Sequence, residues 1–202
     1  KGIDIEIGNE ISKQLGIKIE YRGLPWIRIK KYAEEGKIDG ILSMFCLEKY
    51  LKIIDFAESP IKSELSIFAL KESKIKIDSF NDIKNLKVGV IRGYTYTPEF
   101  NSYKNMRKIV CNNDGELLTR LRDKRIDLAV SETIPFLFLA KKQGLSTQLE
   151  ELYTVTENKL CIGFSKKALG NESKIWADKF AEVLTKLYED GVIQNILDNY
   201  LK

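Results

Sequence analysis

Short apolar runs alternate with helix-length charged stretches along almost the whole chain, and this alternation restricts the fold more than any other feature. Apolar runs of this length, bounded by glycines and charged residues, are typical of buried strands. The stretches between them carry apolar stripes at helical spacing, as in residues 3–15, where Ile7 and Ile11 share a face. The alternation predicts an α/β fold with mixed, mostly parallel sheets.

The same patterns predict the individual elements. Pro25 lies near the first turn of a helix, where its missing N–H costs nothing, and Ser79 is placed to cap a short helix. Gly16 and Gly36 mark helix ends. We expect helices at 3–15, 25–35, 79–86, 113–125, 133–144 and 172–201, with a further helix starting within 92–100. We expect strands at 17–23, 38–44, 62–71, 87–91, 107–111, 126–132 and 160–166.

The composition excludes several classes of function. The 202 residues are 44% hydrophobic, which suits one large domain or two small ones. The chain has no histidine, so Ser-His and Cys-His nucleophile pairs and most zinc sites are excluded. The net charge of +4 arises from interspersed charges, and no basic block is interleaved with aromatics, so we expect no nucleic-acid partner. No apolar stretch reaches the roughly 18 residues that a membrane span needs.

The three cysteines, Cys46, Cys111 and Cys161, are far apart in the sequence and form no CxxC pair. They fit three buried small hydrophobic residues, or one disulfide if the compartment is oxidising. The sequence leaves both interpretations open.

A sequence pattern that occurs twice in the chain suggests where a ligand would bind. "EEGKIDGILSM" (34–44) and "RDKRIDLAVSE" (122–132) share a charged helix end, Ile-Asp, an apolar strand and a polar end. The repeated pattern is either a coincidence between two helix-to-strand connections or an indication that the chain has two similar lobes. Ligands of open α/β sheets bind beyond the carboxyl ends of strands. The candidate strand ends are therefore Ser43-Met44, Arg92-Gly93 and Ser131-Glu132.

Seven motifs carry a family resemblance. In order they are "GIDIEIGNEISKQLG", "PWIRI…EEGKIDGILSM", "EKYLKIIDFAESPI", "DIKNLKVGVIRGYTY", "LRDKRIDLAVSE", "LCIGFSKK" and "LYEDGVIQNILDNYLK". Together they resemble the extracellular solute-binding proteins of family 3, the receptors of polar amino-acid ABC importers. The resemblance runs from Gly2 to the C-terminus.

The resemblance implies a two-lobe periplasmic-binding-protein fold of type II, with a ligand cleft between the lobes. Lobe one would comprise residues 1–66 plus 160–202, lobe two residues 67–159, and the hinges would lie near 66–70 and 158–162. Family members usually begin with a strand before the helix at 3–15. We therefore expect the natural protein to have residues before Lys1, and lobe one as given to lack its first strand.

The resemblance also implies a ligand-binding set at the strand ends. Trp26 would face the ligand from the start of a lobe-one helix, although an ordinary core tryptophan is the competing interpretation. The segment 92–100 matches a Gly-X-Thr turn whose backbone N–H groups approach the ligand. The expected ligand-binding residues are Trp26, Ser43, Met44, Cys46, Tyr50, Arg92, Gly93, Tyr94, Thr95 and Glu132.

Two positions depart from the family pattern. Amino-acid binders of the family carry an arginine at the position of Tyr50, where it grips the ligand's α-carboxylate with two parallel hydrogen bonds. Arg28 or Arg92 would substitute for it, or both are surface charges. Glu132 stands where the family commonly has an aspartate for the α-ammonium, and it is otherwise explained as a helix N-terminal glutamate.

Four classes of function remain after these observations. The leading one is non-catalytic binding of a small zwitterionic or anionic solute outside the cytoplasm, in the periplasm or anchored by lipid, by a monomer that serves an importer permease. A second is the ligand-sensing domain of a membrane signalling protein. A cyclohexadienyl-type dehydratase and a purely structural domain are the third and fourth. We expect no cofactor, no metal and no catalytic residue.

Overall fold

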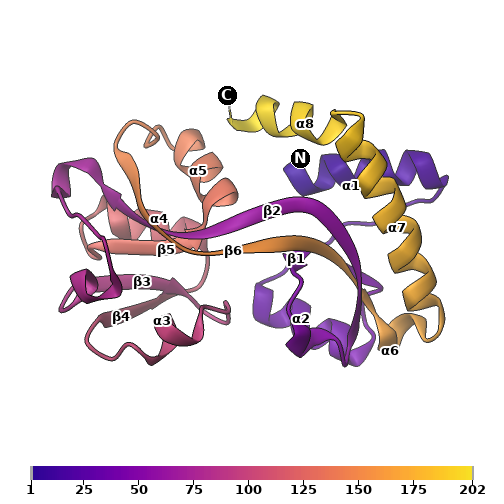
Figure 1. Cartoon of the computed structure of the whole chain (residues 1–202), viewed down its shortest axis with the longest axis horizontal. Coiled ribbons are helices and arrows are strands. Elements are labelled where there is room, and N and C mark those ends of the chain that lie inside the picture. The colour runs from indigo at the N-terminus through magenta and orange to yellow at the C-terminus, as the bar shows by residue number, and fades with distance from the viewer. Residues whose placement is uncertain (1, 202) are drawn as a thin grey trace. The chain divides into compact units, whose positions relative to one another are not determined.

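A computed structural model describes residues 2–201, of which residue 201 is described by its backbone alone. The chain forms two compact units. Unit 1 comprises Lys1–Lys62 and Asn158–Lys202, and unit 2 comprises Ser63–Glu157. Two strands of 17 residues each, β2 (Ile54–Leu70) and β6 (Leu149–Ser165), carry the chain from one unit to the other (Figure 1).

The strands follow one another in the order β1-β6-β2-β5-β3-β4. Their bounds are β1 Gly40–Phe45, β3 Lys87–Ile91, β4 Arg107–Cys111 and β5 Leu128–Glu132. β3 pairs in parallel with β4 and β5, whereas the β1–β6 and β2–β5 pairs are antiparallel. The sheet is therefore mixed as expected, but "mostly parallel" holds only for the β5-β3-β4 part. These are the strands that helical crossovers connect, as parallel pairing requires.

Unit 1 is built around its own helices. They are α1 (Ile3–Leu15), α2 (Trp26–Glu35), α6 (Lys166–Leu169), α7 (Glu172–Glu189) and α8 (Val192–Leu201), with the short 3-10 helix η1 (Glu48–Tyr50). The apolar stripe of α1 packs as predicted, with Ile7 and Ile11 buried beside residues of α7 and α8 (Figure 1). Gly16 ends α1 in the left-handed conformation, with φ 65°.

Unit 2 has a hydrophobic cluster on each side of its strands. Its helices are η2 (Lys71–Ser73), η3 (Phe80–Ile83), α3 (Pro98–Ser102), α4 (Asp114–Arg122) and α5 (Thr133–Lys142). One cluster includes Val88, Phe100 and Val130, and the other places the predicted leucine face of α4 against Phe136. Ser79 caps η3 as predicted, in a reciprocal box with Asp82.

Several predicted elements differ from the structure. The strands β2 and β6 begin at Ile54 and Leu149, well before the predicted starts at 62 and 160. Residues 17–23 form no strand, because no described residue pairs with them in a ladder; Ile17 and Ile19 nevertheless pack on the core of unit 1. The C-terminal helix is two helices, α7 and α8, because Gly191 adopts φ 73° between them.

The structure shows which of the three cysteines are bonded to each other. Cys46 and Cys161 form a disulfide with Cα atoms 5.5 Å apart, and Cys111 is a free, buried thiol. Both bonded cysteines belong to unit 1. Of the two interpretations left open by the sequence, one disulfide is the correct one.

Candidate functional site

Three of the predicted ligand-binding residues gather in one cluster of unit 1. Met44 of β1 is buried, and Trp26 and Tyr50 pack against the cluster that contains it while remaining half-buried. Half-buried aromatic rings present a flat face beside an apolar core, which suits both packing and contact with a ligand. Trp26 is thus neither a fully buried core residue nor an isolated surface residue.

Local backbone chemistry places these aromatic residues. Pro25 is the N-cap of α2, so Trp26 is the first residue of the helix, and Gly36 ends it at φ 71°. The buried Ser165 hydroxyl donates to the Ala33 carbonyl at 2.6 Å and so ties α2 to the end of β6. Tyr50 ends η1, with the Lys49 ammonium 4.9 Å from its ring centroid.

The structure shows the bonding of Cys46, whose contribution to ligand binding stays a prediction. Its sulfur is bonded to Cys161, so it offers no thiol to a ligand. The half-buried Ser43 lies on β1, and Met44 is paired with Cys161 in the β1–β6 ladder. The disulfide therefore holds the end of β1 and the η1 segment that follows it.

In unit 2, the turn after β3 carries four predicted residues. The Arg92 N–H donates to the Cys111 carbonyl at 2.8 Å, which fixes the turn to the end of β4, while the Arg92 residue is exposed. Gly93 adopts φ 81°, where a glycine is favoured, and the Tyr94 N–H closes the turn onto Ile91 at 3.2 Å. Tyr94 and Thr95 are half-buried.

The Tyr94 side chain belongs to a polar cluster that the sequence did not predict. Asp114, the first residue of α4, accepts a hydrogen bond from the Ser131 hydroxyl, and its charge raises the pKa of Tyr94. Ser131 lies on β5 directly before Glu132 and is fully buried. Residues from the start of α4 and the end of β5 therefore meet at one carboxylate.

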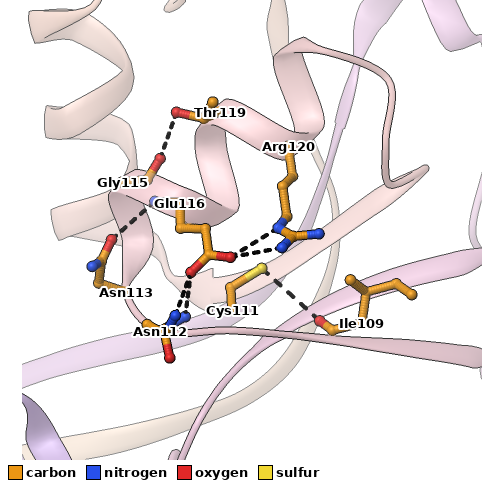
Figure 2. A network of polar contacts seen from close by, with 8 residues as sticks. All are labelled: Ile109, Cys111, Asn112, Asn113, Gly115, Glu116, Thr119 and Arg120. Atoms are coloured by element: carbon orange, nitrogen blue, oxygen red, sulfur yellow. Dashed lines mark hydrogen bonds and ion pairs between the residues drawn. The ribbon is translucent and has the colours of Figure 1, made fainter.

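The start of α4 is held in place by its own network of polar contacts (Figure 2). The Asn113 side chain caps the helix by accepting from the Glu116 N–H at 2.9 Å. Glu116 in turn accepts from the Asn112 backbone and side chain, both at 2.8 Å, and from Arg120 at 2.8 and 2.9 Å (Figure 2). Asp114 thus sits on a backbone that is fixed on both sides.

Burial and nearby charges shift the pKa values of residues in this cluster. Burial raises the pKa of Asp114, although the hydrogen bond from Ser131 opposes the shift. Burial also raises the pKa of Tyr94, and the nearby charges of Asp114 and Glu132 raise it further. Tyr94 is therefore a protonated hydroxyl at neutral pH, placed among acceptors.

Glu132, the predicted acceptor for a ligand ammonium, is half-buried at the end of β5. It pairs with Leu65 of β2 in the antiparallel ladder, and the next residue, Thr133, donates its hydroxyl to Ser66 at 3.0 Å. The charge of Glu132 contributes to the raised pKa of Tyr94.

The structure thus brings the predicted residues into two groups, one in each unit, and the contribution of each residue to ligand binding stays a prediction. Asp114 was missed because only the ends of three strands were considered. The end of β4, which Asn112 and Asn113 follow, was the signal that would have found it.

The structure adds two findings on metals and membranes. Within residues 2–201, no three Asp, Glu or Cys side chains gather as they would around a metal ion. None of the helices in this described part is both long and apolar enough to cross a bilayer.

Comparisons with solved structures agree with this architecture. An arginine-binding protein from T. maritima, in mutant form, superposes with a TM-score of 0.84, at 18% identity, over 99% of this chain and 85% of that chain. AbpA from Streptococcus pneumoniae, an amino acid ABC transporter substrate-binding protein bound to L-arginine, gives 0.83 at 18% identity, over 100% and 84%. A histidine kinase sensor domain gives 0.80 at 20% identity, over 99% and 86%. These likenesses show the fold, the type of two-lobe α/β architecture that the sequence predicted.

Sequence comparisons identify the family. The lysine/arginine/ornithine-binding periplasmic protein of Escherichia coli (strain K12) is 25% identical over 137 residues, which are 66% of this chain. The match spans about half, 52%, of that relative's length. The profile of the bacterial extracellular solute-binding proteins, family 3, matches residues 1–202. The chain therefore belongs to family 3 of the bacterial extracellular solute-binding proteins.

Proposed function

We propose that the protein binds a small polar solute that carries an ammonium group, an amino acid or a related zwitterion, and that it performs no catalysis. The observation that carries the proposal is the cluster in unit 2, where the hydroxyl of Ser131, the residue before Glu132, donates to Asp114, and the charges of both carboxylates raise the pKa of Tyr94. Two carboxylates beside a protonated hydroxyl favour a cationic group. The relatives named for lysine, arginine, ornithine and L-arginine support a ligand of this kind.

Unit 1 adds apolar and aromatic surface to this proposal. Trp26 and Tyr50 offer half-buried rings beside Met44. Aromatic faces can cover the carbon chain of a ligand or attract a cationic group. Tyr50 cannot supply the charge with which an arginine binds an α-carboxylate. We therefore propose that the protein selects its ligand mainly by the ammonium group.

We further propose that the protein acts outside the cytoplasm and delivers its ligand to the membrane permease of an ABC importer. The Cys46–Cys161 disulfide supports an oxidising compartment. The family match and the AbpA likeness support the importer as partner. We propose a monomer that needs no cofactor.

A thermal-shift screen followed by calorimetric titration tests the binding proposal. The purified chain is screened with the twenty amino acids, with ornithine and agmatine, and with dicarboxylates that lack an ammonium. We expect melting-temperature increases for ammonium-bearing probes only. Stabilisation by dicarboxylates alone, or by no probe, would refute the proposed ligand class.

The second candidate is a ligand-sensing domain of a membrane signalling protein, favoured by the likeness to a histidine kinase sensor domain. The two candidates share the ligand site and differ in the partner. Reconstitution decides between them: the ligand-loaded protein should stimulate ATP hydrolysis by an importer encoded beside it. Failure to do so, with a kinase encoded in the same open reading frame, would favour the sensor.

A further inference from the structure

Strand β4 (Arg107–Cys111) lies at one end of the strand order, in unit 2 (Figure 1). It pairs with β3 through five consecutive residue pairs, and within residues 2–201 no strand pairs with its other edge. The edge of a sheet exposes backbone N–H and C=O groups to which another extended chain can bond. β4 therefore offers a place where a further strand can join the sheet.

Two hydrogen bonds show which backbone groups of β4 face this free edge. The Arg107 N–H donates to the carbonyl of the residue before β3 at 2.9 Å, and the Cys111 carbonyl accepts from the N–H of the residue after β3 at 2.8 Å. Both residues therefore direct their backbone groups toward β3. Because this direction alternates from one residue of a strand to the next, the N–H and C=O groups of Lys108 and Val110 point to the free edge.

The side chains of β4 leave this edge open. Val110 is 47% exposed, and Arg107 and Lys108 are exposed as well. The Lys108 side chain lies against the end of α3, where its ammonium donates to the carbonyls of Phe100 and Asn101 at 3.4 and 3.3 Å. The strand has neither a proline nor a bulge, which are two features that block pairing at the edges of many sheets.

The charges near β4 determine which chain can pair there. Residues 100–113 include three basic residues, Lys104, Arg107 and Lys108, and no acidic residue. Lys87, the β3 partner of Arg107, adds a fourth positive charge. Positive charges on two copies of the same edge repel each other, so they disfavour the pairing of two β4 strands. The same charges attract an extended segment that carries carboxylates.

We propose that β4 is an interaction surface for an acidic, extended segment of a partner protein, which joins the sheet as a further strand. The backbone groups of Lys108 and Val110 bond to this segment, as in other cases of strand addition. Arg107 and Lys104 bind its carboxylates. The surface uses none of the candidate ligand-binding residues, so the inference goes beyond the proposed function and does not depend on it.

Two peptides test the proposal on the full chain. One is a capped hexapeptide of alternating glutamate and valine, and the other carries lysine in place of glutamate. Calorimetric titration should detect binding of the acidic peptide, with an affinity about tenfold or more above that of the lysine peptide. Equal affinities would overturn the proposal, because charge would then not select the partner, and so would a failure of the acidic peptide to bind.

Amide hydrogen exchange followed by NMR reports strand addition directly. In the free protein, the amides of Lys108 and Val110 should exchange faster than those of Ile109 and Cys111, which bond to β3. A saturating concentration of the acidic peptide should slow exchange at Lys108 and Val110 by about tenfold or more. Slower exchange elsewhere, but not at these two amides, would place the peptide on another surface and contradict the proposal.

Val110→Pro removes one outward N–H and leaves the bonds to β3 in place, because proline is tolerated where the N–H of an edge strand faces solvent. The loss of one hydrogen bond should weaken binding of the acidic peptide about fivefold or more. The matched control is Val110→Ala, which keeps the N–H and should change the affinity by about twofold at most. Wild-type affinity in a folded Val110→Pro variant would refute the pairing.

A methylated peptide keeps the test decisive if Val110→Pro does not fold. Methylation of all backbone nitrogens leaves the carboxylates of the acidic peptide but removes its N–H donors, so its affinity for the wild-type chain should fall about tenfold or more. An unchanged affinity would indicate attraction by charge alone and would overturn the proposal. Analytical ultracentrifugation tests the other occupant: a wild-type dimer that Val110→Pro dissociates would assign the edge to a second copy of the chain instead.

Discussion

Tyr50 is the residue at which we expect this chain to depart most from its family in chemistry. It is half-buried at the end of η1 and, like Trp26, packs against the cluster that contains Met44. We predict that Tyr50→Arg gains affinity for α-amino acids by about tenfold or more, because a guanidinium forks onto a carboxylate with two charge-assisted bonds.

Calorimetric titration of L-arginine and agmatine into Tyr50→Arg measures this gain. Agmatine lacks the α-carboxylate, so its affinity should not rise. Tyr50→Lys is the matched control, since a lysine is a point charge without the planar fork. Equal gains for Arg and Lys, or a gain for agmatine, would contradict the role assigned to position 50.

Asp114 and Glu116 have opposite titration shifts two residues apart, which gives a prediction with a definite sign. Burial raises the pKa of Asp114, so the folded state holds that proton more tightly than the unfolded state. The stability contributed by Asp114 therefore falls as pH rises from its unfolded value of 3.8 through the raised folded pKa. Bonds from Asn112 and Arg120 lower the pKa of Glu116, so its contribution rises as pH rises from below its folded pKa through its unfolded value of 4.5.

Urea unfolding of Asp114→Asn and Glu116→Gln between pH 3 and pH 7 checks this prediction. The free energy of unfolding relative to wild type should rise with pH for Asp114→Asn and fall with pH for Glu116→Gln. Each substitution removes one titrating group and leaves the other, so each variant is the control for its neighbour. Slopes of the same sign would contradict the assignment of the two carboxyl groups.

At the scale of the element, two asparagines are helix N-cap residues, but only one of them makes a capping hydrogen bond with its side chain. Asn113 caps α4 through its side chain, whereas Asn171 is the N-cap of α7 and makes no side-chain cap bond. We predict that Asn113→Ala lowers the free energy of unfolding by about 1 kcal/mol, because the Glu116 N–H loses its acceptor.

Chemical denaturation of both alanine variants measures the difference. Asn171→Ala is the control and should change stability by less than about 0.5 kcal/mol. A loss in Asn171→Ala equal to that in Asn113→Ala would show that the cap bond of α4 is not the cause.

Most elements could be predicted because their signals are local. The strands at 87–91 and 107–111 and the helix at 3–15 have the bounds that the apolar pattern predicts. The exceptions are elements whose bounds depend on the strands with which they pair. β2 begins at Ile54, eight residues before the predicted strand, because pairing in a sheet extends a segment whose own pattern is interrupted by Pro60.

At the scale of the molecule, the sequence predicted the candidate site residues that lie at strand ends. It missed Asp114, whose contact joins distant parts of the chain. Tyr94 and Glu132 follow or end apolar strands and were found from the sequence. Asp114 meets Ser131 across 17 residues; the end of β4 indicates where to look for Asp114, but only the structure shows this contact. The candidate binding residues at strand ends could be named from the sequence, whereas the contact between Asp114 and Ser131 required the structure.

The disulfide acts on the whole chain because it joins the two sequence segments of unit 1. Cys46 and Cys161 are 115 residues apart, and all of unit 2 lies between them. Closing a loop of this length removes much conformational freedom from the unfolded chain, which in chain-entropy terms stabilises the fold by roughly 4–5 kcal/mol. We predict that the reductant dithiothreitol lowers the melting temperature of the wild-type protein.

A Cys46→Ala/Cys161→Ala variant is the matched control, since its lower melting temperature should not respond to dithiothreitol. Alkylation followed by mass spectrometry supplies an independent count of thiols. Without reductant, the denatured wild-type protein should be alkylated at Cys111 alone, because the other two sulfurs are bonded to each other. Alkylation at all three cysteines in protein purified under oxidising conditions would contradict the disulfide. A melting temperature that dithiothreitol leaves unchanged, despite verified reduction, would show that the bond constrains the unfolded chain far less than its loop length implies.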